Sequence, residues 1–336
     1  NEIQYTTIGT KGKFEDFGNL SSGRQTAAAV STSVQATITA GATSGDTVTN
    51  IIEYINIMTL GNAIDLGDLK TSRRANGAFG SPVRGVVVAV IGGTGVLGSA
   101  IAKGLAGHGA IVGILGRNQD RGFNVCSDIV EAGGTADFVK CNALDVDSLE
   151  FARKTLQKQF GNVDVLINSA GGNRSNATVT DDLHIEDIVL SDWSEAFDLN
   201  LVGGALLPCQ VFGRVMAERG TGSIVNIASI AGHIPLSRVV AYSAAKAAVV
   251  NFTQFLAREW ASSGVRVNSI TPGFFPAEQN RSLLFGDDGT PTPRAQQILD
   301  HTPLNRFGKP DELVGAAVFL SSSGASGFVT GTDLRV

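Results

Sequence analysis

From Gly85 onward, short and almost wholly apolar segments alternate with longer helical ones. Segments this short and this apolar are typical of strands that are buried on both faces of a sheet. Strands that alternate with helices predict an α/β fold, a Rossmann-like doubly wound parallel sheet of about seven strands. The expected strands are residues 86–91, 111–115, 136–140, 163–168, 223–228, 265–270 and 332–336, and the expected helices are 97–108, 118–132, 146–160, 191–218 and 240–262.

Residues 1–84 differ, because they repeat internally with a shift of 49 positions, so that Tyr5 matches Tyr54 and Gly18 matches Gly67. Their content of Gly, Thr, Ser and β-branched residues predicts short antiparallel strands joined by turns. A period near fifty resembles a kelch-type propeller blade, yet two blades cannot close a propeller. We therefore expect a β-rich repeat segment over 1–84 and a Rossmann-type α/β domain over 85–336. The repeat segment is a remnant, a module completed by other chains or a loosely ordered extension.

Composition excludes several classes of function. A net charge of −5 without a basic stripe argues against a nucleic-acid partner. We find no apolar run of the eighteen or more residues that a membrane span requires, and no signal peptide. Three scattered cysteines and four scattered histidines predict free thiols in the cytoplasm and no metal site.

A glycine-rich turn follows the first expected strand. Gly93, Gly95 and Gly98 form G-x-G-x-x-G between a strand and a helix, which is the context that a dinucleotide site requires. The glycines let the backbone approach a pyrophosphate, and the helix N-terminus supplies N–H donors. The alternative is a glycine turn without a ligand.

The second expected strand ends in Gly116, where an NAD site usually has an acidic residue, and Arg117 follows. A guanidinium suits a 2′-phosphate, so the sequence favours NADP over NAD. Asn142, after the third strand, could bond adenine. The small residues 168–171 after the fourth strand would allow a cofactor to approach closely.

Ser229 lies thirteen residues before Tyr242, and Lys246 lies four residues after it. Positions i and i+4 share a helix face, so the ammonium of Lys246 should lie beside the phenol. A nearby cation lowers the pKa of a phenol toward neutrality. The arrangement predicts a proton donor and acceptor that works at physiological pH.

Together these motifs resemble the short-chain dehydrogenase/reductase family over about 250 residues. The resemblance implies a homotetramer built on helices 191–218 and 240–262, and catalysis by Asn200, Ser229, Tyr242 and Lys246. The chain departs from the family pattern at Ile91, Val96 and Ala228, and it stops where an Asp-Gly-Gly tail normally follows. The cofactor-binding residues expected are Gly92, Gly93, Thr94, Gly95, Leu97, Gly98, Arg117, Asn118, Asn142, Ala143, Asn168, Ala170, Gly171, Tyr242, Lys246, Pro272, Gly273 and Phe275.

Residues 272–281, 290–294 and 301–308 also resemble the D-mannonate oxidoreductases (fructuronate reductases) of this family. The resemblance implies a small-molecule substrate, D-fructuronate or D-mannonate, with a carboxylate that Arg281 could bind in a bidentate manner. Gln279, Asn280 and Asn173 offer partners for its hydroxyls. Two alternatives stay open: a reductase of 3-oxoacyl groups or of another sugar acid, and a binding protein with an inert reductase half.

Overall fold

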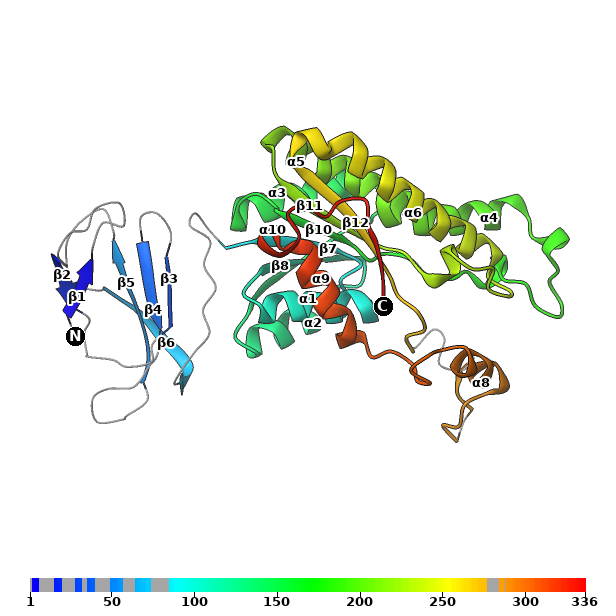
Figure 1. Cartoon of the computed structure of the whole chain (residues 1–336), viewed down its shortest axis with the longest axis horizontal. Helices are drawn as coiled ribbons and strands as arrows, with labels where there is room; N and C mark the ends of the chain where they lie inside the picture. Colours follow the sequence, from blue (N-terminus) through cyan, green and yellow to red (C-terminus); the bar gives the residue numbers. More distant parts are fainter. Residues whose placement is uncertain are drawn as a thin grey trace. The chain divides into compact units, whose positions relative to one another are not determined.

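The computed structural model divides into two compact units, Asn1–Gly85 and Val86–Val336 (Figure 1). It describes residues 85–276, 284–286 and 288–336, and within residues 1–84 it describes the backbone of six strands. These are β1 (Glu2–Tyr5), β2 (Glu15–Asn19), β3 (Ala28–Ser31), β4 (Gln35–Thr39), β5 (Thr49–Asn56) and β6 (Ile64–Arg73).

The two repeats form the same hairpin. Strand β1 pairs with β2 in an antiparallel manner, from Glu2↔Asn19 to Tyr5↔Glu15. Strand β5 pairs with β6 from Ile51↔Asp68 to Tyr54↔Ile64, which is the same register shifted by 49 residues, with a register irregularity at the equivalent place. Strands β3 to β6 form one antiparallel sheet, and β1 and β2 form another. The kelch-type interpretation also depends on the connecting segments, which lie outside the described residues.

The second unit has the predicted parallel sheet of seven strands, in the order β13-β12-β11-β10-β7-β8-β9. Each of its neighbouring strands runs parallel. The Rossmann-like fold is confirmed. The strands are β7 (Val87–Ile91), β8 (Ile111–Gly116), β9 (Thr135–Lys140), β10 (Val165–Asn168), β11 (Gly222–Ile227), β12 (Val265–Thr271) and β13 (Asp333–Arg335).

Helices cover both faces of this sheet (Figure 1). Alternate residues of β7 face two different cores, with Val87 and Ala89 on one side and Val88 and Val90 on the other. The first side is covered by α3 (Val146–Phe160), α5 (Arg214–Arg219) and α6 (Val240–Trp260), and the second by α1 (Val96–Gly107), α2 (Gln119–Glu131) and α9 (Val314–Ser321). The all-apolar strands are thus buried on both faces, as expected.

The helix expected over 191–218 is continuous but irregular. It consists of α4 (Leu190–Phe197), the π-helical segments η3 (Asp198–Leu206) and η4 (Cys209–Gly213), and α5. Contrary to the sequence expectation, Leu190–Arg219 is long and apolar enough to span a membrane. About half of its most apolar window (56%) is buried inside the protein, as in a helix that covers a sheet.

Several elements near the C-terminus were not predicted. They are α8 (Pro293–Asp300), α9 and α10 (Ser323–Ser326). Thr292 caps α8, because its Oγ1 accepts a hydrogen bond from Ala295 N at 3.2 Å, and Pro293 occupies the first turn. The short helices η1 (Ser175–Ala177), η2 (Ile185–Asp187), η5 (Ile230–Gly232), η6 (Ala261–Ser263) and η7 (Pro310–Leu313) complete the unit.

Candidate active site

Two positions of the glycine turn between β7 and α1 have no room for a side chain. Gly92 has φ +74°, and a Cβ there would lie 2.6 Å from Ala170 N. A Cβ at Gly98 would lie 2.4 Å from the carbonyl oxygen of Gly92. Backbone hydrogen bonds close the turn, from Gly92 N to Leu115 O (2.8 Å) and from Gly95 N to Gly92 O (3.0 Å), so it needs no hydroxyl at Ile91. Only glycines fit this backbone.

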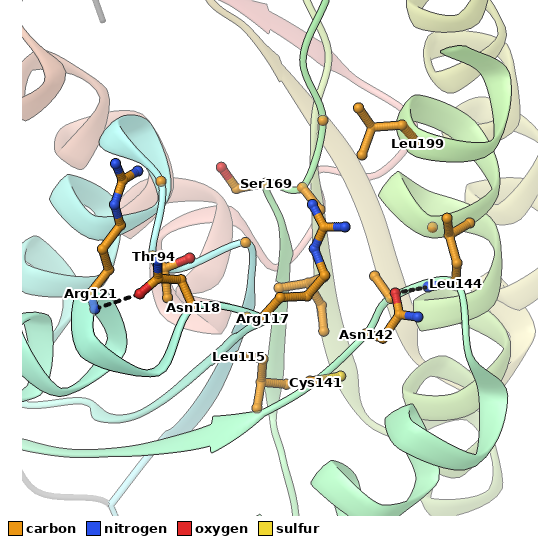
Figure 2. A pocket seen from close by; sticks show the side chains of 18 residues that line it. Thr94, Leu115, Arg117, Asn118, Arg121, Cys141, Asn142, Leu144, Ser169 and Leu199 are labelled. Atoms are coloured by element: carbon orange, nitrogen blue, oxygen red, sulfur yellow. Dashed lines mark hydrogen bonds between the residues drawn. The ribbon is translucent and has the colours of Figure 1, made fainter. Parts of the chain in front are cut away.

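A cavity of about 660 Å³ lies beside this turn, at the carboxyl ends of β7, β8, β9 and β10 (Figure 2). The sheet order changes direction between β7 and β10, and ligands of doubly wound sheets bind at such a point. Gly95 begins α1 without a side-chain cap, so the first N–H groups of the helix remain available to an anion. The turn and the cavity fit a dinucleotide.

Nine of the residues expected to bind the cofactor line this cavity: Gly92, Thr94, Gly95, Arg117, Asn118, Asn142, Ala143, Ala170 and Gly171. Asn142 Oδ1 accepts a hydrogen bond from Leu144 N at 3.2 Å (Figure 2). Arg121 also lines the cavity and was missed by the sequence analysis. The available signal was its position in the first turn of α2, which follows the same strand end as Arg117.

Other expected cofactor residues lie outside the lining. Leu97 packs in the core beneath the sheet, and Phe275 is buried there against Gly308. Asn168 is fully buried, and its Nδ2 donates to Asn226 Oδ1 at 2.8 Å. Gly93, Gly98, Pro272 and Gly273 are also absent from the lining.

Ser229, Tyr242 and Lys246 come together at the end of β11. Ser229 caps η5, and a hydrogen bond joins its side chain to that of Tyr242 on α6. Lys246 lies one helical turn further along, with Nζ 5.8 Å from the centroid of the Tyr242 ring. The ammonium is 4% exposed and donates to Ile227 O at 2.7 Å. The predicted i, i+4 arrangement is therefore present.

Asn200 lies in the π-helical segment η3 and is fully buried. Its side chain exchanges two hydrogen bonds with the backbone of Gly172, both of 2.9 Å. A Cβ at Gly171 would lie 2.8 Å from Asn200 Oδ1 and 3.1 Å from Lys246 Nζ. Because Gly171 has no side chain, Asn200 and Lys246 can both approach its backbone beside the cavity. π-Helical segments often occur at functional sites.

The pKa of Tyr242 differs from the value that the sequence predicts. Burial raises the pKa of Tyr242, and the hydrogen bond with Ser229 only partly opposes this. Burial also lowers the pKa of Lys246 to about 8. The expected lowering of the Tyr242 pKa by Lys246 is wrong here, because the removal of water from the phenol is the larger effect.

The burial of Lys246 predicts how the free energy of unfolding depends on pH. The unfolded chain keeps this proton up to about pH 10.5, whereas the folded protein releases it near pH 8. Between these values the unfolded state binds more protons, so Lys246 should increase the free energy of unfolding as pH rises, by at most about 3 kcal/mol. Denaturant titrations of wild type and Lys246→Met should show a difference in stability that changes across this window.

Exposed Lys158 on α3 provides the control, and Lys158→Met should leave the pH dependence of stability unchanged. The comparison uses differences between variant and wild type, because cysteine and tyrosine side chains of the unfolded chain also lose protons in this range. If the difference in the free energy of unfolding between wild type and Lys246→Met does not change with pH, Lys246 is not held in a water-poor site.

Of the four residues expected to bind substrate, the structure describes only Asn173. Asn173 is exposed, and its Nδ2 donates to Thr178 Oγ1 at 2.7 Å, so its amide is engaged within its own loop. Gln279, Asn280 and Arg281 lie outside the described residues.

Comparisons with known proteins agree with this geometry. The short chain dehydrogenase family profile matches residues 86–284. The uncharacterised oxidoreductase UxuB of Bacillus subtilis is 42% identical over 264 residues, which are 76% of this chain and 94% of UxuB.

Two solved structures are also similar. A Haemophilus influenzae protein, provisionally described as a D-mannonate oxidoreductase and solved with NAD, is 39% identical with a TM-score of 0.69, over 74% of this chain and 92% of that one. A gluconate 5-dehydrogenase of Burkholderia cenocepacia, solved with NADP and tartrate, is 30% identical with a TM-score of 0.67, over 76% and 94% of the two chains. With its glycine turn, its cavity and its Ser229–Tyr242–Lys246 cluster, the chain belongs to the short chain dehydrogenase family of oxidoreductases.

Proposed function

We propose that the second unit interconverts a ketone and a secondary alcohol with a nicotinamide cofactor. When bound, the nicotinamide supplies or accepts the hydride. The hydrogen bond between Ser229 and Tyr242, at the end of the cavity-forming sheet, carries this proposal. Tyr242 donates a proton to the ketone oxygen during reduction, and Ser229 donates a hydrogen bond to the same oxygen.

The Tyr242 phenol is protonated at neutral pH, as an ordinary phenol is and as its raised pKa also implies, so it can donate a proton to the ketone oxygen. Lys246 would hold the ribose of the cofactor beside Gly171, where its ammonium already lies. Asn200 holds the Gly172 backbone in place and would anchor a proton-relay water.

The substrate that we propose is a small sugar acid, D-fructuronate or D-mannonate. The support is the likeness of residues 272–281 to the D-mannonate oxidoreductases, together with the similarity to a structure described in those terms. The similar gluconate 5-dehydrogenase was solved with tartrate, another small hydroxy acid. Arg281 would bind the carboxylate, with Gln279, Asn280 and Asn173 at the hydroxyls.

A panel of ketones tests this proposal. The full chain is assayed with D-fructuronate, other keto sugar acids and an acetoacetyl thioester, each with NADPH and with NADH. We expect reduction of D-fructuronate with the highest kcat/KM. Preference for the thioester would favour a 3-oxoacyl reductase instead. If neither nucleotide binds in a fluorescence titration, the reductase half is inert and the chain acts as a binding protein.

We further propose that NADP is preferred. A Cβ at Gly116 would lie 2.8 Å from Thr94 Oγ1, so an acidic side chain cannot enter this position without displacing Thr94. Arg117 and Arg121 both line the cavity here, and Figure 2 shows them on either side of Asn118. Two guanidinium groups suit a 2′-phosphate, whereas NAD lacks this group.

Arg117→Gln should therefore lower kcat/KM with NADPH by roughly tenfold or more and leave the value with NADH nearly unchanged. The estimate follows from about 1.5–3 kcal/mol for a hydrogen bond to a charged group. Lys158→Gln, which removes an exposed cation outside the cavity, is the control. Equal losses with both nucleotides would contradict a role for Arg117 at the 2′-phosphate.

We also propose a cytoplasmic homotetramer that contacts neither membrane nor nucleic acid. Cys126, Cys141 and Cys209 are free thiols, in keeping with a reducing compartment. The helices expected at the subunit interface carry an apolar hollow lined by Leu206, Phe252 and Phe255, the last of which is 60% exposed. Light scattering after size-exclusion chromatography measures the assembly.

A further inference from the structure

His233 lies at the centre of a cluster of polar side chains that the proposed reaction does not use. It follows η5, four residues after Ser229. Its Nε2 lies 3.0 Å from Asp333 Oδ2 and 3.3 Å from Thr271 Oγ1. On the other side of the ring, Nδ1 lies 3.2 Å from a guanidinium nitrogen of Arg335. The ring therefore joins η5 to β12 and β13.

These contacts determine where the ring carries its proton. A guanidinium group can only donate, so Nδ1 must accept from Arg335, and the proton is on Nε2. Asp333 Oδ1 already accepts from Ser269 Oγ (2.5 Å) and Thr271 Oγ1 (2.7 Å). Nε2 lies 3.0 Å from Asp333 Oδ2 without a hydrogen bond to it, and its hydrogen bond goes to Thr271 Oγ1. Because Thr271 Oγ1 donates to Asp333 Oδ1, it accepts from the imidazole, and the cluster thus selects the tautomer with its proton on Nε2.

The same cluster fixes the backbone that carries Ser229. Gly232 packs against α6, where a Cβ would lie 2.8 Å from the backbone carbon of Lys246. Ile230 N donates to Pro272 O at 3.1 Å, and Gly232 N donates to Ser229 O at 2.9 Å. The short segment η5 is therefore held by α6 on one side and, through His233, by β12 and β13 on the other.

We propose that His233 is a positioning residue, which Thr271 and Arg335 hold in one tautomer and which keeps Ser229 aligned with Tyr242. The proposal rests on the proposed function, because alignment matters only if Ser229 donates to the substrate oxygen. His233 does not line the cavity and acts through the η5 backbone. Its effect should appear in kcat, because alignment of the donor acts on the transition state more than on binding.

Two substitutions at this position separate positioning from simple packing. His233→Leu keeps a side chain of similar size but loses the donor to Thr271, and we expect kcat to fall by about tenfold, with KM and nucleotide affinity nearly unchanged. His233→Gln places an amide N–H near the position of Nε2, and we expect it to retain most of the activity. His108→Leu, at an exposed histidine that ends α1, is the control.

A second measurement does not depend on turnover. Long-range ¹H–¹⁵N NMR spectra of the histidine rings in the full chain should show His233 as the Nε2–H tautomer. In Arg335→Gln, which alters an exposed residue, the spectrum should show a mixture of tautomers. The Nδ1–H tautomer in wild type, or kcat in His233→Leu equal to that of wild type, would overturn the proposal. If no sugar acid is reduced, the proposed function fails, whereas the NMR result still decides the arrangement of His233.

Discussion

Replacing Tyr242 by phenylalanine should lower kcat by roughly 10²–10⁴-fold, which is the usual contribution of a positioned acid or base. The variant keeps the ring, so the 5.8 Å contact between the ring centroid and Lys246 Nζ should remain. It loses the hydroxyl that bonds Ser229, and with it the proton for the substrate oxygen. Nucleotide affinity, measured by NADPH fluorescence, should stay close to that of wild type.

Tyr54→Phe, in the separate N-terminal unit, is the matched control and should leave kcat unchanged. Ser229→Ala should give a smaller loss than Tyr242→Phe, because it removes a hydrogen bond to the ketone and leaves the proton donor in place. A Tyr242→Phe variant that turns over as fast as wild type would exclude the phenol as the proton donor.

Gly98→Ala should abolish most nucleotide binding. The added Cβ would lie 2.4 Å from the carbonyl oxygen of Gly92, so the glycine turn must move away from α1. Insertion of one carbon into a closely packed site typically costs about 1–3 kcal/mol. Because about 1.4 kcal/mol corresponds to a tenfold change in affinity, NADPH should bind roughly five- to hundredfold more weakly.

Gly107→Ala is a control on the same helix, since a Cβ there would meet no atom within 4 Å. Alanine is the better helix former by about 1 kcal/mol in a helix interior, so this variant should melt no lower than wild type and bind NADPH normally. The glycine turn would not be the nucleotide site if Gly98→Ala bound NADPH with unchanged affinity.

Much of the second unit could be predicted from sequence because its strands are nearly pure apolar runs. The expected helix over 146–160 matches α3 at both ends, where Asp145 caps the first turn with two hydrogen bonds. Helix α9 was missed although its sequence is highly apolar, because its short run follows directly on η7. The π-helical stretches of 198–213 have no comparable sequence signal, since they arise from packing against the sheet.

The site was predictable where chemistry depends on spacing along the chain. The glycine turn and the pair Tyr242 and Lys246 follow from local sequence alone. The pKa of Tyr242 did not, because it depends on how much water the surrounding fold excludes. The cluster around His233 also escaped prediction, since Asp333 and Arg335 reach it from one hundred residues away.

The shared hairpin register of the two repeats has a consequence for the junction between the units. Shifted by 49 residues, β4 would correspond to residues 84–88, but Val87 and Val88 already belong to β7 and are buried in the dehydrogenase core. The same valines cannot serve both sheets. A second copy of β4 could form only if the Rossmann sheet gave up its inner strand β7, so the nucleotide-binding fold sets the point at which the repeat pattern must end.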